Sequence, residues 1–295
     1  ALQVSDDEKF GSVLERELNK IGMPGFDRVE VLSFGVSGFG TAQELLALKH
    51  HALQFKPDIV LLAFLPANDL RNNSRVLEPG QPRPYFEIVD GRLEPDFSFR
   101  SHPVYQYALT DSRRFKTALI NSSRLLQLVQ AVRTRDTARS ESADDETVRD
   151  RVGLDDQCFI EPRDTDWKNA WTLTERLIGE IHRETTDHDA LFALAAITSG
   201  IQVNPDDTKR EAFAQRLGVT SLDYSETRIE ALGAQLGFSV IRLSEPLLEY
   251  AKKHDEYLHG FANTALGEGH WNSAGHREAA RICAKALRQQ WANQK

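Results

Sequence analysis

The sequence predicts an α/β domain with a mostly parallel central sheet, and two observations lead to this prediction. Four short apolar runs have the length and composition of strands that are buried on both faces: residues 29–34, 58–64, 190–197 and 238–243. Amphipathic stretches typical of helices alternate with these runs. Because parallel strands need crossover connections that are usually helical, the alternation favours a three-layer α/β/α arrangement.

Five stretches have helical apolar spacing, and two of them have recognisable ends. Ser5 and Glu8 form a capping box, which predicts a helix that begins there and runs to about Lys20. Gly237 follows another stretch at the position where a left-handed residue ends a helix. The five predicted helices cover residues 5–20, 43–55, 166–184, 223–235 and 273–291.

Residues 72–162 interrupt the alternation of strands and helices. Residues 86–93 predict a β-hairpin with Asp90 and Gly91 at its turn, and residues 117–132 have helical spacing. Residues 133–151 are charged and poor in apolar side chains, which is typical of a segment without a packed core. We interpret residues 72–162 as an insertion within a single domain that spans residues 1–295. It either caps a site or is a surface excursion without a role.

Aromatic side chains of this insertion have two interpretations. They either line an apolar pocket for a substrate or form a small core of the insertion itself. The residues concerned are Tyr85, Phe86, Phe97, Phe99 and Tyr105.

Composition excludes some classes of partner. The formal net charge of −8 repels phosphate backbones, so nucleic acid is not an expected partner. No apolar run reaches the ~18 residues that a bilayer-spanning helix needs. The first ten residues show no signal peptide, but a trimmed protein would look the same. The compartment therefore stays open, and an extracytoplasmic location in a bacterium is compatible with a signal or anchor further upstream.

The two cysteines, Cys158 and Cys283, are too few for a disulfide framework and lack metal-ligand spacing. We expect both to be free thiols. Neither the cysteines nor the scattered histidines predict a metal site.

A glycine-rich block follows the first predicted strand: Gly35, Gly38 and Gly40 lie just before a predicted helix. Such a loop exposes backbone N–H groups at the carboxyl edge of the sheet, where ligands bind in doubly wound folds. The glycine spacing differs from the dinucleotide fingerprint, and Ser37 does not fit a nucleophile elbow because Phe39 stands where that motif requires glycine. The N–H groups of this loop can hold a phosphate or an oxyanion.

Asn68 and Asp69 end the second predicted strand, at the same edge of the sheet. The amide of Asn68 can serve as an oxyanion donor there, or the pair can simply form a turn that caps the strand. Near the C-terminus, His270 precedes the last predicted helix, where a loop histidine can act as a general base. His276 falls within the first turns of that helix.

These blocks, in this order, resemble the second, third and fifth blocks of SGNH (GDSL-like) hydrolases. The resemblance spans nearly the whole chain, and the Gly-His-Trp-Asn-x-x-Gly-His block at residues 269–276 is its most specific part. It implies a flavodoxin-like fold in which Gly38 and Asn68 bind the oxyanion and His270 activates a serine.

The sequence departs from the family pattern at two positions. Pro66 stands where the third block usually begins with glycine, and Gly267 stands where the family places an aspartate three residues before the histidine. Glu268 is the nearest carboxylate to His270 in the sequence and is a candidate for the acid of the triad.

The family's first block, Gly-Asp-Ser, is not found in the printed sequence. We hypothesise that this strand and its serine lie upstream of Ala1, because Ser5 fits a helix cap better than a nucleophile. The resemblance implies a serine ester hydrolase that needs no cofactor and acts on a small-molecule or glycan ester. An O-acetyltransferase acting on a glycan and a non-catalytic carbohydrate- or protein-binding module are the alternatives.

Overall fold

The computed structural model describes residues 3–124, 127, 155–261 and 265–294. Its centre is a parallel sheet with the strand order β1-β4-β5, formed by β1 (Ile59–Phe64), β4 (Leu191–Ala196) and β5 (Ser239–Arg242). Phe64 pairs with Ala196, and Ala196 pairs with Arg242, so the carboxyl ends of the three strands lie level at one edge. The predicted α/β class and parallel sheet are confirmed.

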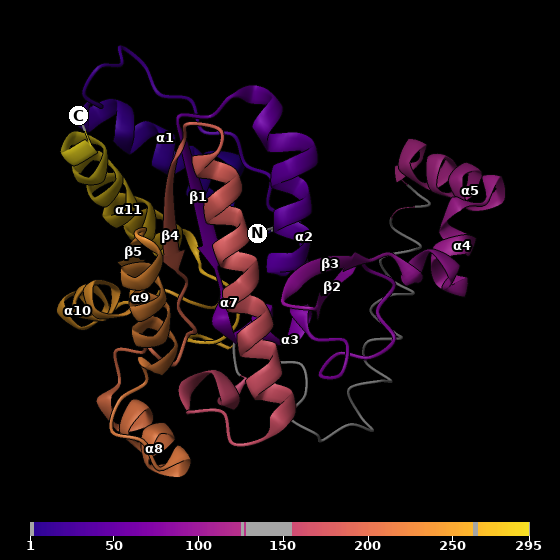
Figure 1. Ribbon diagram of the computed structural model, residues 1–295. Coiled ribbons are helices and arrows are strands. Elements are labelled where there is room, and N and C mark those ends of the chain that lie inside the picture. Colours follow the sequence, from indigo (N-terminus) through magenta and orange to yellow (C-terminus); the bar gives the residue numbers. More distant parts are fainter. Residues whose placement is uncertain (1–2, 125–126, 128–154, 262–264, 295) are drawn as a thin grey trace.

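Helices cover both faces of this sheet (Figure 1). The first face carries α2 (Thr41–Ala47), α3 (Pro66–Asn73), α7 (Thr165–Thr186) and α9 (Tyr224–Leu236). The second face carries α1 (Phe10–Ile21), α10 (Ser244–His254) and α11 (Ser273–Gln294).

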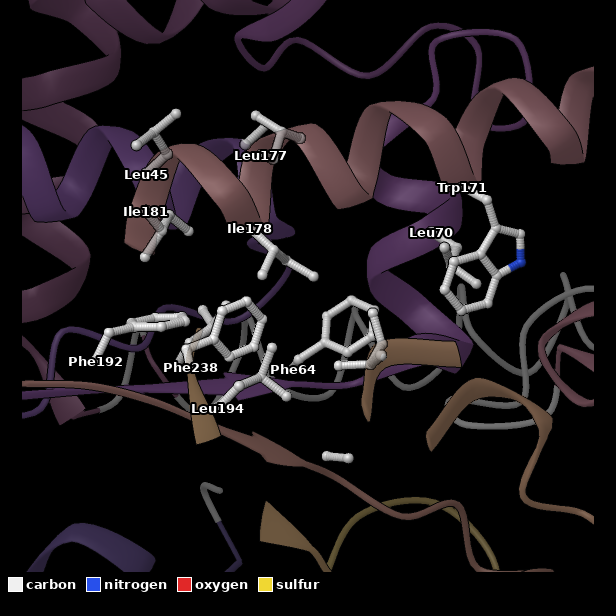
Figure 2. Close-up of a cluster of buried hydrophobic side chains, with 14 of the residues drawn as sticks. Leu45, Phe64, Leu70, Trp171, Leu177, Ile178, Ile181, Phe192, Leu194 and Phe238 are labelled. Atoms are coloured by element: carbon white, nitrogen blue, oxygen red, sulfur yellow. The ribbon is translucent and has the colours of Figure 1, made fainter. Parts of the chain in front are cut away.

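Strand β4 separates two hydrophobic cores. Phe192 and Leu194 belong to the core on the first face, where Figure 2 shows them beside the side chains of α7. Ala193 and Ala195 alternate with them and belong to the core on the second face, against α11. All six residues of β4 are buried, which explains why the strand reads as an uninterrupted apolar run.

Residues 29–34 form no strand, which corrects the first of the four strand predictions. Their backbone bonds instead to side chains of α1. The Asn19 amide donates to the Val29 carbonyl (2.7 Å) and accepts from its N–H (2.8 Å), and Glu15 accepts the Val31 N–H (2.9 Å). These side chains satisfy backbone groups that a neighbouring strand would otherwise pair. Val29 and Val31 still pack against the second core, so the apolar pattern reflected burial and not strand pairing.

The capping-box prediction at Ser5 is also wrong. Ser5 bonds the Glu8 carboxylate (2.6 Å), but the turn over Asp6–Glu8 is an isolated 3₁₀ turn. Lys9 is extended (ψ 148°), and α1 begins only at Phe10.

The other four helix predictions are confirmed with small shifts of their bounds. Helices α7, α9 and α11 match the predicted ranges to within three residues at each end, and Gly237 ends α9 in the left-handed region. Helix α2 begins at Thr41 and continues through a π turn (Leu48–Ala52) and a 3₁₀ turn (Leu53–Phe55). Four helices of the described residues were not predicted: α3, α4 (Pro103–Leu109), α8 (Asp207–Leu217) and α10.

The insertion begins with the predicted hairpin, formed by β2 (Tyr85–Val89) and β3 (Arg92–Asp96). It continues through a 3₁₀ turn (Ser98–Ser101) into α4 (Pro103–Leu109) and α5 (Asp111–Ser122), which lie away from the sheet in Figure 1. Of the helix predicted over residues 117–132, residues 117–122 belong to α5, Arg124 and Gln127 are also helical, and residues 125–126 and 128–132 lie outside the described residues. Residues 133–151 lie outside the described residues. A 3₁₀ turn (Asp156–Phe159) leads back towards α7.

The insertion's aromatic side chains serve as core. Phe86 is buried in the core of the first face, and Tyr85 is also buried. Phe99 packs on Phe97 (ring centroids 6.4 Å apart) and edge-on against Tyr105 (4.8 Å). The packing favours the core interpretation over a substrate pocket.

Both cysteines are free and buried, as expected. Within the described ranges, none of the helices combines the length and apolarity that crossing a bilayer requires.

Candidate functional site

The candidate site lies at the carboxyl edge of β1 and β4. The two chains leave the sheet side by side, because the Ile197 N–H donates to the Phe64 carbonyl (2.8 Å). Asn68 follows β1 by four residues, and Thr198 follows β4 by two. Polar groups from separate parts of the sequence therefore meet at this edge, where ligands bind in parallel sheets.

Asn68 lies in the first turn of α3 and not in the predicted strand-end turn. Pro66 is the first residue of this helix, a position where its missing N–H costs nothing, and the helix therefore begins directly after β1. The Asp69 carboxylate accepts the Leu65 N–H (2.7 Å) and so caps the helix start. The half-buried Asn68 makes no side-chain hydrogen bond to a described residue, so its amide remains available to a ligand.

A buried acidic pair lies next to Asn68. Burial raises the pKa of Asp69 to about 8, opposed by the bond from the Leu65 N–H. Burial also raises the pKa of Glu44 on α2 well above its ordinary value, with repulsion from Asp69 adding to the effect. Glu44 as a residue is only half-buried, but its Oε2 atom is sealed from solvent and has no partner among the described residues. We infer that the pair keeps at least one proton at neutral pH.

Gly38 lies in an exposed turn that is closed by a bond from the Phe39 N–H to the Val36 carbonyl (3.1 Å). Its φ of +80° is the value that the third residue of a type II turn requires and that glycine adopts without strain. The Gly38 carbonyl accepts a bond from Arg83 Nη1 (3.1 Å), and its N–H has no partner among the described residues. The N–H is therefore left without an internal partner, and its role as an oxyanion donor stays a prediction.

Arg83 connects the insertion to this turn. Besides the bond to Gly38, Arg83 forms an ion pair with Glu78 (2.9 Å) that holds the guanidinium in place. One residue on, the Pro84 carbonyl accepts a bond from Gln43 Nε2 of α2 (2.6 Å). The start of the insertion is thus attached to the glycine block, which favours a role beside the site over a detached excursion.

The loop that carries His270 is held by backbone pairing. His259 and Trp271 form an isolated antiparallel bridge, and the Gly260 N–H donates to the His270 carbonyl (3.0 Å). The Gly267 N–H donates to the His259 carbonyl (2.9 Å). The His270 imidazole is exposed and has no hydrogen bond to a described residue, so it is available to a substrate or a nucleophile.

Side chains fasten the same loop to the end of β4. Thr198 Oγ1 accepts from Trp271 Nε1 (3.2 Å) and bonds His259 Nε2 (3.2 Å), and His259 Nδ1 bonds the Gly269 carbonyl (2.7 Å). Thr198, His259 and Trp271 are all buried. His270 is therefore placed at the carboxyl edge of β4, next to the edge of β1 from which α3 and Asn68 begin.

His276 lies inside α11, as predicted. Both of its ring nitrogens are sealed from solvent without a partner among the described residues, and burial lowers its pKa to about 4. Its ring packs edge-on against Trp271 (5.8 Å between centroids). A neutral, sealed imidazole of this kind has a packing role.

An aspartate at Gly267, where the family pattern would place one, would be strained. The φ of Gly267 is +83°, and a Cβ atom would lie 2.9 Å from Asn204 Nδ2 and 3.1 Å from the Tyr257 ring. A Cβ on Gly200, in the loop after β4, would lie only 2.0 Å from the Gly267 carbonyl oxygen. The close backbone approach at this point leaves Glu268, which is half-buried, as the carboxylate nearest to His270 in the sequence.

The structure places Asn68 and the His270 loop at the ends of the adjacent strands β1 and β4, while Gly38 lies in a separate turn bonded to Arg83. Within the described ranges, no hydrogen bond links any two of Gly38, Asn68 and His270. Sequence reasoning missed Thr198, His259 and Arg83, because their partners lie tens of residues away in the chain. No group of three or more His, Cys, Asp or Glu side chains in the described part of the chain is placed to hold a metal ion.

Comparison with known proteins gives no assignment. No protein-family model, no curated protein and no solved structure matches this chain.

Proposed function

We propose that this chain is the larger part of an SGNH-type serine hydrolase with a flavodoxin-like fold, and that it cleaves carboxylic esters through an acyl-enzyme. The observation that supports the proposal is that two motif residues, Asn68 and His270, lie in connections at the carboxyl ends of adjacent strands. Asn68 begins the connection after β1, Thr198 holds the His270 loop at the end of the adjacent strand β4, and Gly38 presents a free N–H. A general base and two oxyanion donors are the groups that ester cleavage needs at one edge.

In the proposed mechanism, a serine hydroxyl attacks the ester carbonyl while His270 takes its proton. The Gly38 N–H and the Asn68 amide stabilise the negative charge that develops on the carbonyl oxygen. His270 then returns the proton to the leaving alkoxide, and a serine ester remains. Water attacks this acyl-enzyme with His270 again as the base, which releases the carboxylic acid and regenerates the serine.

We propose that a strand outside the printed sequence supplies the serine. Strand β1 pairs with β4 on one side, and within the described ranges its other edge has no strand partner. Ala63 of β1 is exposed, so this edge of the sheet is open to a further strand. A parallel strand paired with β1 there would end at the edge that carries His270.

Glu268 is the proposed partner that orients the imidazole. The backbone at Gly267 disfavours a side chain at the family's usual position, and Glu268 is the next carboxylate before His270 in the sequence. Arg83 gives the insertion a place beside the oxyanion turn, from which it would contact the alcohol or acyl part of the ester.

The test uses the natural protein extended at its N-terminus, with hydrolysis of p-nitrophenyl acetate and butyrate as the readout. We expect turnover by the extended protein, none by the printed chain, and a loss of at least about 10³-fold in kcat for His270→Ala. Asn68→Ala should lower kcat by about 10²-fold, the usual cost of one oxyanion donor.

The control variant is His188→Ala. His188 is an exposed histidine in the turn between α7 and β4, at the opposite edge of the sheet, and its Nδ1 bonds the Glu184 carbonyl of α7 (2.8 Å). The variant should keep full activity. Turnover by the printed chain that survives His270→Ala would overturn the assignment of roles. Acetyl transfer to a glycan in preference to water would make the protein a transferase.

A further inference from the structure

The conformation of His270 depends on the two peptide groups that flank it. The carbonyl of Gly269 precedes His270, and the carbonyl of His270 itself follows. The first accepts a bond from His259 Nδ1 (2.7 Å), and the second accepts from the Gly260 N–H (3.0 Å). Because both peptide planes are held, the direction in which the Cα–Cβ bond of His270 points is fixed.

The tautomer of His259 follows from its partners. A carbonyl oxygen only accepts, so Nδ1 must carry the proton, and Nε2 is left as an acceptor. Thr198 therefore donates its hydroxyl hydrogen to Nε2, and its oxygen accepts the indole N–H of Trp271. One arrangement satisfies every polar atom of this buried chain, from the indole to the Gly269 carbonyl.

The protonation state agrees with this geometry. His259 is only 3% exposed, and burial lowers its pKa to about 4, with the nearby His270 and His276 adding to the effect. At neutral pH the ring is therefore uncharged, with one donor and one acceptor nitrogen.

Resting on the proposed function, we propose that His259 is a positioning residue for the general base His270. It touches neither substrate nor nucleophile in this role. It fixes the peptide before His270 through Nδ1, and it is itself fixed through Nε2 by Thr198 at the end of β4. The rigid sheet thus determines the orientation of the His270 imidazole, although His270 lies in a loop.

Two substitutions separate this role from simple core packing. His259→Asn places an amide N–H at about the position of Nδ1 and keeps the bond to Gly269. His259→Phe keeps a ring of similar size but removes both bonds. His182→Phe is the matched control, because it also replaces a histidine by phenylalanine but at a site far from the loop. His182 packs against Phe192 and Phe238.

The first readout, amide hydrogen exchange of the Gly260 and Gly267 N–H groups, does not depend on activity. We expect His259→Phe to raise their exchange rates about tenfold, the effect of losing one net hydrogen bond, while His259→Asn and His182→Phe leave them near the wild-type rates. Unchanged exchange in His259→Phe overturns the inference.

The second readout is ester hydrolysis by the N-terminally extended protein. His259→Phe should lower kcat by about 10²-fold with KM little changed, because His270 would be misoriented while the residues that bind the ester are unchanged. His259→Asn should restore kcat. If His270→Ala abolishes turnover but His259→Phe does not, the positioning role fails while the proposed function stands. If the extended wild type hydrolyses no ester, the proposed function fails, and the exchange rates alone decide whether His259 orders the loop.

Discussion

Replacing Thr198 by valine tests the hydrogen-bonded chain that fastens the His270 loop to the sheet. The hydroxyl is buried and serves two partners, Trp271 Nε1 and His259 Nε2. Valine keeps the shape of the side chain but leaves one donor and one acceptor without a partner. Each buried unsatisfied group costs about 1–3 kcal/mol, so we expect a loss of about 2–4 kcal/mol in the free energy of unfolding after local relaxation.

Thr185→Val is the matched control. Thr185 is fully buried in α7, and its hydroxyl donates only to the Ile181 carbonyl (2.8 Å), which the helix backbone already satisfies. Its loss should cost about 1 kcal/mol or less. Urea unfolding of both variants and the wild type measures the difference, provided that the slopes of the transitions agree. Equal destabilisation of the two variants would refute the idea that the Thr198 hydroxyl satisfies two buried groups.

Two further predictions concern the acidic pair and the glycine before the histidine. Because the folded-state pKa of Asp69 (about 8) is raised above its unfolded value, its contribution to stability is complete below pH ~4 and is lost as pH rises through ~8. The free energy of unfolding should therefore fall between pH ~7 and ~8. Asp69→Asn should make this fall smaller in urea titrations at several pH values. If the free energy of unfolding falls equally steeply with pH in the variant, the prediction is contradicted. Gly267→Asp should lower stability by about 2–3 kcal/mol in thermal melts, since it meets Asn204 and Tyr257. Gly218→Asp, at a similar φ but with no atom within 4 Å of the added Cβ, should cost about 1 kcal/mol, and equal costs would count against the steric argument.

The elements that sequence reasoning predicted well are those whose signal is local. The uninterrupted apolar run of β4 predicts a buried strand, and the helical apolar spacing of α7 predicts an amphipathic helix. The hairpin β2–β3 follows from its Asp-Gly turn.

The failures come from interactions between distant residues. Whether residues 29–34 form a strand depends on a partner strand, and Asn19 and Glu15 of α1 take that place. Helix α3 was missed because Asn68 and Asp69 were interpreted as the end of a strand, whereas Pro66 begins a helix there and Asp69 caps it. The position of the His270 loop depends on Thr198, more than seventy residues earlier, and no local pattern indicates such a bond.

Labelling with a fluorophosphonate tests the central claim most directly, because the reagent forms a stable bond only with a serine that a base activates. The N-terminally extended protein and its His270→Ala variant would be treated side by side, and the labelled peptide identified by mass spectrometry. The account predicts one labelled serine, located upstream of the printed sequence, and no label in the variant. A label on Ser5 or Ser37, or a label that persists without His270, would contradict it.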